Sequence, residues 1–381
     1  MKPVTILNPK KLVFGNGSFE QFVSDIIASS YKRIFLVTFK EILPALDSSL
    51  EKIKKSNKEV YTELSIVTEP SFEMFGIVKQ KANDFRPDCV VGIGGGSVLD
   101  VAKLVTALLG NEQTIDDIIG INNLKSRSLP LICLPTTSGT GSEMSPNAIL
   151  LDETDKLKKG IISPFLVADV AYIDPKLTLT VPAAVTAATG LDALTHCIEA
   201  YTNKFAHPVV DQYALEGIKL IGQSLRKAYK DGSDIQARTD LALGSMYGGM
   251  CLGPVNTAAV HALSYPLGSS YKIAHGLSNA LLLPHIMRFN LPAVVEKYSK
   301  IAMALGVEST ADKQELANKG IEKITELSVA CNVPQRMSDI LIPESDIENL
   351  AESAMKVQRL LVNNPREVTL KDALAIYKAA F

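Results

Sequence analysis

Short runs of β-branched residues alternate with helix-patterned segments through the first half of the chain. Strands are predicted at 33–37, 59–67, 88–93 and 131–134, and helices at 41–56, 72–84 and 98–108. Alternation of this kind is typical of a parallel sheet whose strands are joined by crossover helices. The first half therefore predicts an α/β domain.

The pattern changes near Pro182. Helices of ordinary globular length are predicted at 183–201, 211–229, 237–250, 294–305 and 312–331, and strand-like runs nearly vanish. We therefore predict two domains, an α/β domain at 1–181 and an all-helical domain at 182–381. The length of 381 residues agrees with this number of domains.

Composition excludes several classes of protein. Hydrophobic residues make up 46% of the chain and charged residues 21%, which is typical of a globular protein and not of a disordered one. The net charge of −2 lacks the basic excess that neutralises nucleic-acid phosphates. No apolar run approaches the roughly 18 residues of a membrane span. We expect no nucleic-acid partner and no membrane insertion.

The five cysteines are scattered and form no C-x-x-C pair. An odd and sparse set of this kind indicates reduced thiols and not a disulfide framework. The first residues also lack the apolar core of a signal peptide. These features predict a cytoplasmic protein.

A glycine-rich turn follows the predicted strand at 88–93, with the sequence Gly94-Gly95-Gly96-Ser97. Glycines let the backbone approach a phosphate closely, and a helix start offers free N–H groups to it. Ser97 and Asp100 also have the spacing of a capping box, which predicts that they mark the helix start. Phosphate binding and a plain serine-capped turn are both open interpretations.

A second polar turn follows the predicted strand at 131–134. It carries five hydroxyl side chains in nine positions, Pro135-Thr136-Thr137-Ser138-Gly139-Thr140-Gly141-Ser142-Glu143. Hydroxyls can donate to ribose or phosphate oxygens, although an ordinary polar loop has the same composition. Both turns follow the carboxyl end of a strand, which is the edge where α/β sheets bind ligands.

Candidate metal ligands lie in the second half. Asp192 and His196 are four residues apart in the predicted helix at 183–201, so they share one helix face. His261 and His275 flank a short segment further along the chain. One carboxylate and three imidazoles suit a divalent transition metal such as Fe²⁺ or Zn²⁺. Taken singly, each histidine is equally compatible with a structural role.

Taken together, these motifs resemble the iron-containing (group III) alcohol dehydrogenases from end to end. The matching stretches are 94–97 with Asp100 and Lys103, 135–143, 187–196, 261–276 and 364–367. The resemblance implies a Rossmann-like dinucleotide-binding domain followed by a helical metal-binding domain. It also implies a homodimer or larger homo-oligomer that transfers hydride between NAD(P) and a small alcohol, aldehyde or ketone.

The resemblance further implies the site residues. The metal, Fe²⁺ or alternatively Zn²⁺, would be held by Asp192, His196, His261 and His275. The nicotinamide cofactor would be bound by Gly94, Gly95, Gly96, Ser97, Asp100, Thr136, Thr137, Thr140 and Ser142, with Lys158 near its nicotinamide end. A metal that binds a hydroxyl oxygen lowers its pKa, and the resulting alkoxide passes hydride to the cofactor.

Two positions depart from the family pattern. Tyr265 stands where many relatives carry a histidine that relays a proton, and a tyrosine hydroxyl is a poorer relay at neutral pH. Phe39 stands where NAD-preferring relatives often carry an acidic residue. Phe39 has no carboxylate to repel the 2′-phosphate of NADP, and Lys40 is adjacent. Both NADP and NAD, the cofactor that the family resemblance favours, are therefore compatible with the sequence.

Two other functions are compatible with parts of this pattern. A lyase similar to dehydroquinate synthase would also bind a nicotinamide cofactor and a metal, but the segment from 192 to 275 has few basic residues for its substrate. A non-catalytic nucleotide- or metal-binding protein is the third hypothesis. For the dehydrogenase, the candidate pocket residues are Asn147, Cys251, Tyr265, Asn363 and Asn364, which favour a small polar or short-chain substrate.

Overall fold

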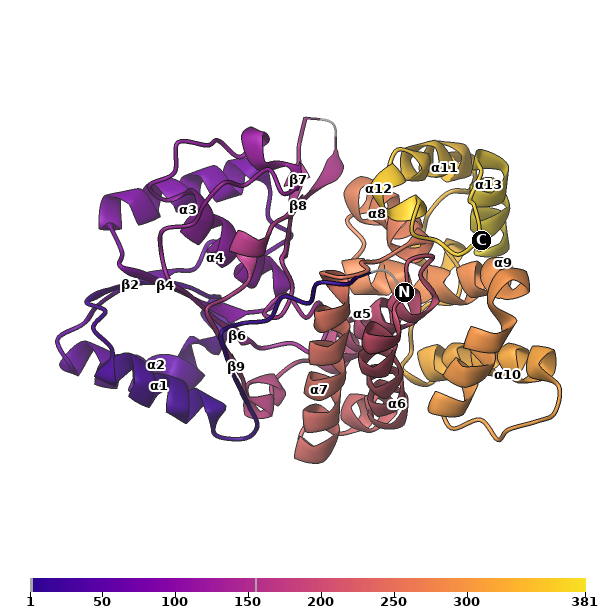
Figure 1. Cartoon of the computed structure of the whole chain (residues 1–381), viewed down its shortest axis with the longest axis horizontal. Helices are drawn as coiled ribbons and strands as arrows, with labels where there is room; N and C mark the ends of the chain where they lie inside the picture. The colour runs from indigo at the N-terminus through magenta and orange to yellow at the C-terminus, as the bar shows by residue number, and fades with distance from the viewer. Residues whose placement is uncertain (1–2, 155) are drawn as a thin grey trace. The chain divides into compact units, whose positions relative to one another are not determined.

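The computed structural model describes residues 3–154 and 156–381. The chain divides into two compact units. Among the described residues, the first contains 7–137, 141–154 and 156–178, and the second contains 3–6, 138–140 and 179–381. Figure 1 shows strands and helices in the first unit and helices in the second. The predicted fold class, a parallel α/β region followed by a mostly helical one, is confirmed.

The first unit is built on a six-stranded parallel sheet with the strand order β1-β9-β6-β4-β2-β3. Its strands are β1 (Lys11–Phe14), β2 (Arg33–Val37), β3 (Glu59–Glu63), β4 (Cys89–Gly94), β6 (Leu131–Pro135) and β9 (Val170–Ile173). The helices of this unit are α1 (Ser18–Ala28), α2 (Leu43–Lys55), α3 (Phe72–Phe85) and α4 (Gly96–Leu108). Each central strand is buried on both faces, which explains its continuous apolar sequence.

Strand pleating divides the core of this unit into two layers. Phe35 and Val37 pack with residues of α3 and α4, whereas Ile34 and Leu36 pack with residues of α1 and α2. A smaller sheet of β5 (Gly120–Ile121), β8 (Leu157–Ile162) and β7 (Asn147–Asp152) completes the unit. Single-turn 3₁₀ helices occur at η1 (Lys40–Ile42), η2 (Asp116–Ile118), η3 (Pro164–Leu166) and η4 (Pro175–Thr178).

The predicted capping box at the start of α4 is wrong. The N-cap residue is Gly95, and no side chain caps this helix. The Asp100 carboxylate instead accepts hydrogen bonds from the Ser142 hydroxyl at 2.6 Å and the Ile149 backbone N–H at 3.0 Å. Asp100 therefore ties α4 to the second polar turn and to β7, because two distant donors compete successfully for its carboxylate.

Helices are the regular secondary structure of the second unit in its described residues. It contains α5 (Ala183–Thr202), α6 (Pro208–Lys230), α7 (Ile235–Leu252), α8 (Ala259–Tyr271), α9 (His275–Ala304), α10 (Lys313–Ala330), α11 (Ile347–Met355), α12 (Gln358–Leu361) and α13 (Leu370–Ala379), with 3₁₀ turns η5 (Ser338–Ile340) and η6 (Glu344–Asp346). The predicted helix at 294–305 is the last part of α9, which bends at Val294 shortly after Pro292.

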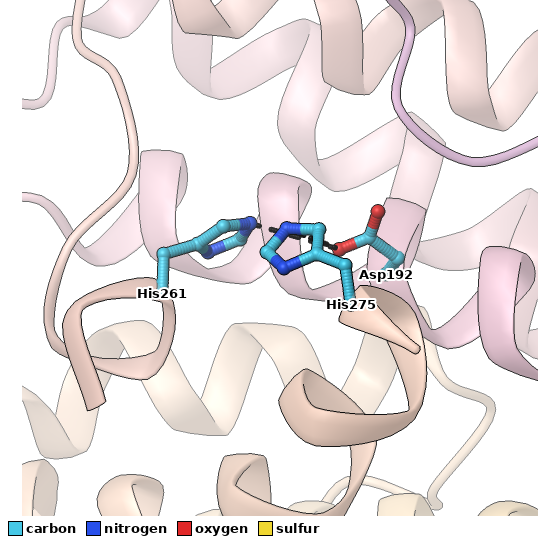
Figure 2. Close-up of side chains that lie close together, drawn as sticks. All are labelled: Asp192, His261 and His275. Atoms are coloured by element: carbon cyan, nitrogen blue, oxygen red, sulfur yellow. Dashed lines mark ion pairs between the residues drawn. The ribbon is translucent and has the colours of Figure 1, made fainter. Parts of the chain in front are cut away.

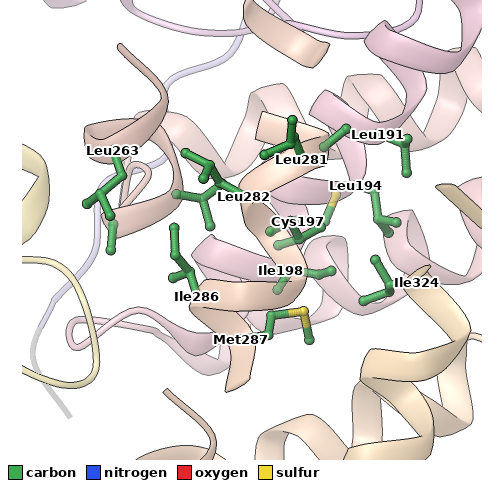
Figure 3. Close-up of a cluster of buried hydrophobic side chains, with 14 of the residues drawn as sticks. Leu191, Leu194, Cys197, Ile198, Leu263, Leu281, Leu282, Ile286, Met287 and Ile324 are labelled. Atoms are coloured by element: carbon green, nitrogen blue, oxygen red, sulfur yellow. The ribbon is translucent and has the colours of Figure 1, made fainter. Parts of the chain in front are cut away.

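Helix α5 lies in the core of the helical unit. Its residues Leu191, Leu194 and Ile198 pack in one buried cluster with residues of α9 such as Leu282 and Ile286 (Figure 3). A helix that is buried on nearly every side has to pair its polar side chains with one another or with neighbouring helices. The polar residues of α5 therefore need partners inside the unit.

No helix in the described part of the chain is both long enough and apolar enough to cross a membrane.

Candidate metal centre and cofactor turns

Three helices bring one carboxylate and two imidazoles together in the helical unit. Asp192 comes from α5, His261 from α8 and His275 from the first position of α9 (Figure 2). Asp192 Oδ1 lies 3.6 Å from His261 Nε2 and 3.7 Å from His275 Nε2. One ligand atom from each residue lies within 4.8 Å of the others, which is close enough for a shared metal ion.

The fourth predicted ligand lies beside this cluster. His196 Nε2 is 3.9 Å from Asp192 Oδ1, one turn further along α5. Its ring stacks on the ring of His261, with the centroids 4.8 Å apart. The structure therefore places all four predicted ligands near one another, but among the described residues the group with ligand atoms mutually within 4.8 Å contains Asp192, His261 and His275 and not His196.

Glu199 is a site residue that sequence reasoning missed. Its Oε2 lies 2.6 Å from His261 Nδ1, and its Oε1 accepts the Val260 backbone N–H at 2.6 Å. The carboxylate thus fixes the orientation of the imidazole and leaves Nε2 facing Asp192. The signal was available, because Glu199 follows Asp192 by two helical turns and shares its face of α5.

Glu199→Gln tests this orienting contact. The amide that replaces the second carboxylate oxygen donates and does not accept, so His261 Nδ1 has to become the acceptor and its proton moves to Nε2. A protonated Nε2 cannot ligate a metal, and we expect metal affinity to fall by roughly 10–100-fold. Metal titration of the purified protein measures this. Glu216→Gln, at an exposed glutamate of α6, is the matched control, and equal affinity in both variants would refute the orienting role.

Asn279 also escaped the sequence analysis. It lies one turn after His275 on α9, and its Nδ2 donates to Asp192 Oδ1 at 2.6 Å. The same Nδ2 lies 3.1 Å from His261 Nε2 and 3.3 Å from His275 Nε2. One carboxylate oxygen and two imidazole nitrogens therefore converge on Asn279 Nδ2. Asn279 Oδ1 is buried and forms no hydrogen bond with any described residue. This donor set fits a divalent cation.

The electrostatics of the candidate metal ligands and Glu199 also favour a bound divalent cation. Burial by itself would raise the pKa of Asp192, but the imidazoles of His196, His275 and His261 hold it well below its ordinary value. Burial lowers the pKa of His196. Burial also disfavours a charged His261, yet Glu199 and Asp192 raise its pKa to about 10. Two buried carboxylates thus create a strongly negative environment around the imidazole nitrogens, and such an environment attracts a cation.

Tyr265 lies at the edge of the cluster. It is one turn after His261 on α8, and the centroid of its ring is 5.8 Å from that of His275. Its hydroxyl accepts a hydrogen bond of 3.2 Å from Arg359 of α12. No spacing signal in the sequence pointed to Arg359, because 94 residues separate it from Tyr265.

The two polar turns of the α/β unit begin side by side. Gly94 pairs with Pro135 at the carboxyl ends of β4 and β6, and the Thr136 N–H donates to the Gly94 carbonyl at 3.0 Å. A Cβ at Gly94 would lie 2.6 Å from Val98 Cβ, so only glycine fits there. Gly95 then caps α4 and lies beside Thr137. This edge offers the N-terminal N–H groups of α4 and nearby hydroxyls.

The remaining predicted cofactor residues occupy different places. Gly96 and Ser97 form the first turn of α4, and Ser142 is buried against Asp100. Thr140 belongs to the segment 138–140, which groups with the helical unit. Phe39 lies half-buried two residues after β2, beyond the carboxyl end of that strand. Lys158 of β8 is buried and forms an ion pair of 2.5 Å with Glu69.

Three of the candidate pocket residues serve the internal packing of the helical unit. Cys251 is completely buried in the apolar core. Asn363 donates to the Thr257 carbonyl at 2.8 Å, and Asn364 exchanges hydrogen bonds with Asn290. Small and amide side chains are common in pockets and in cores, and sequence composition alone does not separate the two.

Comparisons with known proteins support these observations. Residues 9–175 match the iron-containing alcohol dehydrogenase family, and residues 186–381 match the Fe-containing alcohol dehydrogenase family, C-terminal. Long-chain-alcohol dehydrogenase 1 of Geobacillus thermodenitrificans is 37% identical over 387 residues, covering 100% of this chain and 98% of its own length. The NAD-dependent methanol dehydrogenase of Bacillus methanolicus is 36% identical over 77% of each chain. The crystal structure of a 1,3-propanediol oxidoreductase superposes with a TM-score of 0.94 at 34% identity, covering 100% of both chains.

A parallel α/β unit with a helical unit that holds a buried carboxylate–imidazole cluster is the architecture of a metal-dependent oxidoreductase. The chain belongs to the iron-containing alcohol dehydrogenase family, and it is an enzyme of that family. This assignment favours the dehydrogenase over the lyase and over the non-catalytic protein.

Proposed function

We propose that the chain interconverts a small alcohol and its aldehyde or ketone with a nicotinamide cofactor, using Fe²⁺ held by Asp192, His196, His261 and His275. The observation that carries this proposal is the convergence of the Asp192, His261 and His275 ligand atoms within 4.8 Å. Zn²⁺ is the alternative ion, since both metals accept imidazole and carboxylate ligands.

The protein residues have separate tasks in this reaction. A divalent metal, when bound, lowers the pKa of an alcohol hydroxyl and polarises a carbonyl oxygen. Asp192 and the three histidines hold the metal, and Glu199 keeps the His261 ring in the ligating orientation. Tyr265, in place of a proton-relaying histidine, contributes a ring beside His275 and a hydroxyl that is bonded to Arg359. Burial of Asp192, His196 and His261 limits water on that side of the site, whereas His275 is partly exposed.

The cofactor belongs at the edge formed by the Gly94–Ser97 and Thr136–Thr137 turns. The α4 N–H groups suit the pyrophosphate, and the nearby hydroxyls suit phosphate or ribose oxygens. Asp100 and Ser142 support this edge through their mutual hydrogen bond. Lys158 and Thr140 remain candidates for contacts nearer the nicotinamide end. NAD is the cofactor we propose, and NADP is the alternative.

A direct test is metal analysis of the purified protein together with a cofactor-resolved substrate screen. The proposal expects stoichiometric iron or zinc, and oxidation of short alcohols that depends on that metal and on NAD⁺ or NADP⁺. Removal of the metal by a chelator is expected to abolish turnover, and re-addition is expected to restore it. Turnover that survives complete metal removal would contradict the proposal.

Phe39→Asp tests the choice between the two cofactors. A carboxylate beyond the end of β2 would bind ribose hydroxyls and repel a 2′-phosphate, so preference is expected to move toward NAD by about tenfold or more, which is about 1.4 kcal/mol. The ratio of kcat/KM for NAD⁺ and NADP⁺ measures the shift. Phe39→Asn is the control, because asparagine has nearly the same size as aspartate but carries no charge. Equal ratios in the two variants would show that specificity is set elsewhere.

We also propose a cytoplasmic location and a homo-oligomeric assembly for this protein. All five cysteines are unpaired and buried, which agrees with a reducing compartment such as the cytoplasm. We propose a homodimer or a larger homo-oligomer, and sedimentation of the metal-loaded protein measures its mass.

A further inference from the structure

Arg359 is a half-buried cation that has no carboxylate partner among the residues that the structure describes. Its Nη2 donates to the Tyr265 hydroxyl at 3.2 Å, and its Cζ lies 5.9 Å from the centroid of the same ring. Within residues 3–154 and 156–381, no aspartate or glutamate forms an ion pair with it. A guanidinium has five N–H donors in a planar fork, and the protein uses one of them here.

Two other arginines of this chain show what a structural role looks like. Arg238 donates from all three guanidinium nitrogens, to Gly232, Thr186 and Val181, and so joins separate segments of the helical unit. Arg127 forms an ion pair with Asp169. Arg359 has neither kind of contact, so most of its hydrogen-bonding capacity is not used by the fold.

Tyr265 connects Arg359 to the candidate metal centre. The ring of Tyr265 contacts the guanidinium on one side and approaches the His275 ring to 5.8 Å. Asp346 of η6, in the same unit, accepts a hydrogen bond from the Tyr271 hydroxyl. The Tyr265 side chain therefore lies close to both the Arg359 guanidinium and the His275 ring.

We propose that Arg359 determines substrate specificity by binding an anionic group, a carboxylate or a sulfonate, at the far end of a short-chain hydroxy or oxo acid. A planar guanidinium matches the two oxygens of such a group and forms charge-assisted bidentate hydrogen bonds with them. The inference rests on the proposed function, because the hydroxyl or carbonyl end of the same substrate has to reach the metal centre.

The redox chemistry is unchanged by this assignment. The hydroxy acid loses a hydride from its carbinol carbon to the oxidised nicotinamide ring and a proton from its hydroxyl, which yields the oxo acid and the reduced cofactor. Arg359 takes part in neither transfer. It adds binding energy only when the substrate carries an anion, since the guanidinium would otherwise stay solvated or bonded to Tyr265.

The test compares two aldehydes of equal chain length, 4-oxobutanoate and butanal, with metal-loaded enzyme and reduced cofactor. The wild-type protein is expected to have the higher kcat/KM for 4-oxobutanoate. Arg359→Gln is expected to lower the ratio of the two kcat/KM values by about 10–100-fold, the effect of losing hydrogen bonds to a charged group.

Two variants are the controls for this test. Arg359→Lys keeps the positive charge but lacks the planar guanidinium, and it is expected to recover part of the ratio. Arg336→Gln, at an exposed arginine of the same unit, should leave the ratio at its wild-type value.

Binding measured without cofactor gives a second readout. Calorimetry with 4-hydroxybutanoate and with 3-hydroxypropane-1-sulfonate distinguishes a carboxylate site from a sulfonate site, and Arg359→Gln is expected to weaken the preferred ligand. An unchanged ratio in Arg359→Gln, including a parallel loss for both aldehydes, would overturn the inference. Failure of the metal-loaded wild type to reduce either aldehyde would instead overturn the proposed function.

Discussion

Replacing His261 with alanine is expected to reduce turnover by on the order of 10³-fold, which corresponds to about 4 kcal/mol of lost transition-state stabilisation. His261 Nε2 lies 3.6 Å from Asp192 Oδ1 at the point where the ligand atoms converge, so its loss removes one ligand from the candidate metal centre. Metal content per chain is expected to fall together with the rate. Metal analysis and steady-state kinetics on the same preparation measure both.

Two further variants make this result decisive. His261→Ala also leaves Glu199 without its imidazole partner, so a loss of folding has to be distinguished from a loss of metal. Asp192→Asn keeps the shape of the side chain and removes its charge, and it is expected to lose metal while the helical content stays intact. His207→Ala removes a histidine that accepts a backbone hydrogen bond at the start of α6, outside the cluster, and it should retain metal. If His261→Ala keeps both metal and rate, the ligand assignment is wrong.

Gly276→Ala is expected to destabilise the protein by roughly 1–3 kcal/mol through overpacking. A Cβ at this position would lie 2.3 Å from the Ala188 carbonyl oxygen and 3.2 Å from Asp192 Cβ. The first contact is with backbone atoms of α5, which no rotamer change relieves. The start of α9 has to move away from α5, and His275 has to move with it. We therefore expect a lower Tm and weaker metal binding in the same variant.

A second glycine provides the control for this prediction. Gly76 is exposed in the middle of α3, and a Cβ there would meet no atom within 4 Å. Gly76→Ala is expected to stabilise the protein by about 0.5–1 kcal/mol, because alanine loses less backbone entropy in a helix. Calorimetric scans of both variants, with and without added metal, measure the opposite signs. A Gly276→Ala protein with wild-type Tm and metal affinity would show that the contact between α5 and α9 adjusts freely.

The inner strands β2, β4 and β6 and the helices α2 to α7 and α10 could be predicted because their signals are local. The strand prediction at 33–37 coincides with β2, and the helix prediction at 72–84 is one residue shorter than α3. The helices α1, α8 and α11 to α13, the first part of α9 and the short inner strand β9 were missed. The edge strand β1 and the hairpin strands β7 and β8 were also missed. These strands mix polar and apolar residues, since one side of each is less buried, and only pairing with distant segments stabilises them.

The sequence by itself determined the alternation of central strands and helices in the first half, the helical character of the second half, the position of the two polar turns, and which side chains are able to bind a metal. Periodicity and residue chemistry are properties of neighbouring residues, so they are visible without a fold. Only the tertiary structure decided which groups meet. Glu199 and Asn279 form hydrogen bonds with the predicted metal ligands, and Arg359 donates to Tyr265. Asp100 does not cap α4 but accepts hydrogen bonds from Ser142 and Ile149. Most of these contacts join residues far apart in the chain, and their existence depends on how helices pack and not on any local pattern.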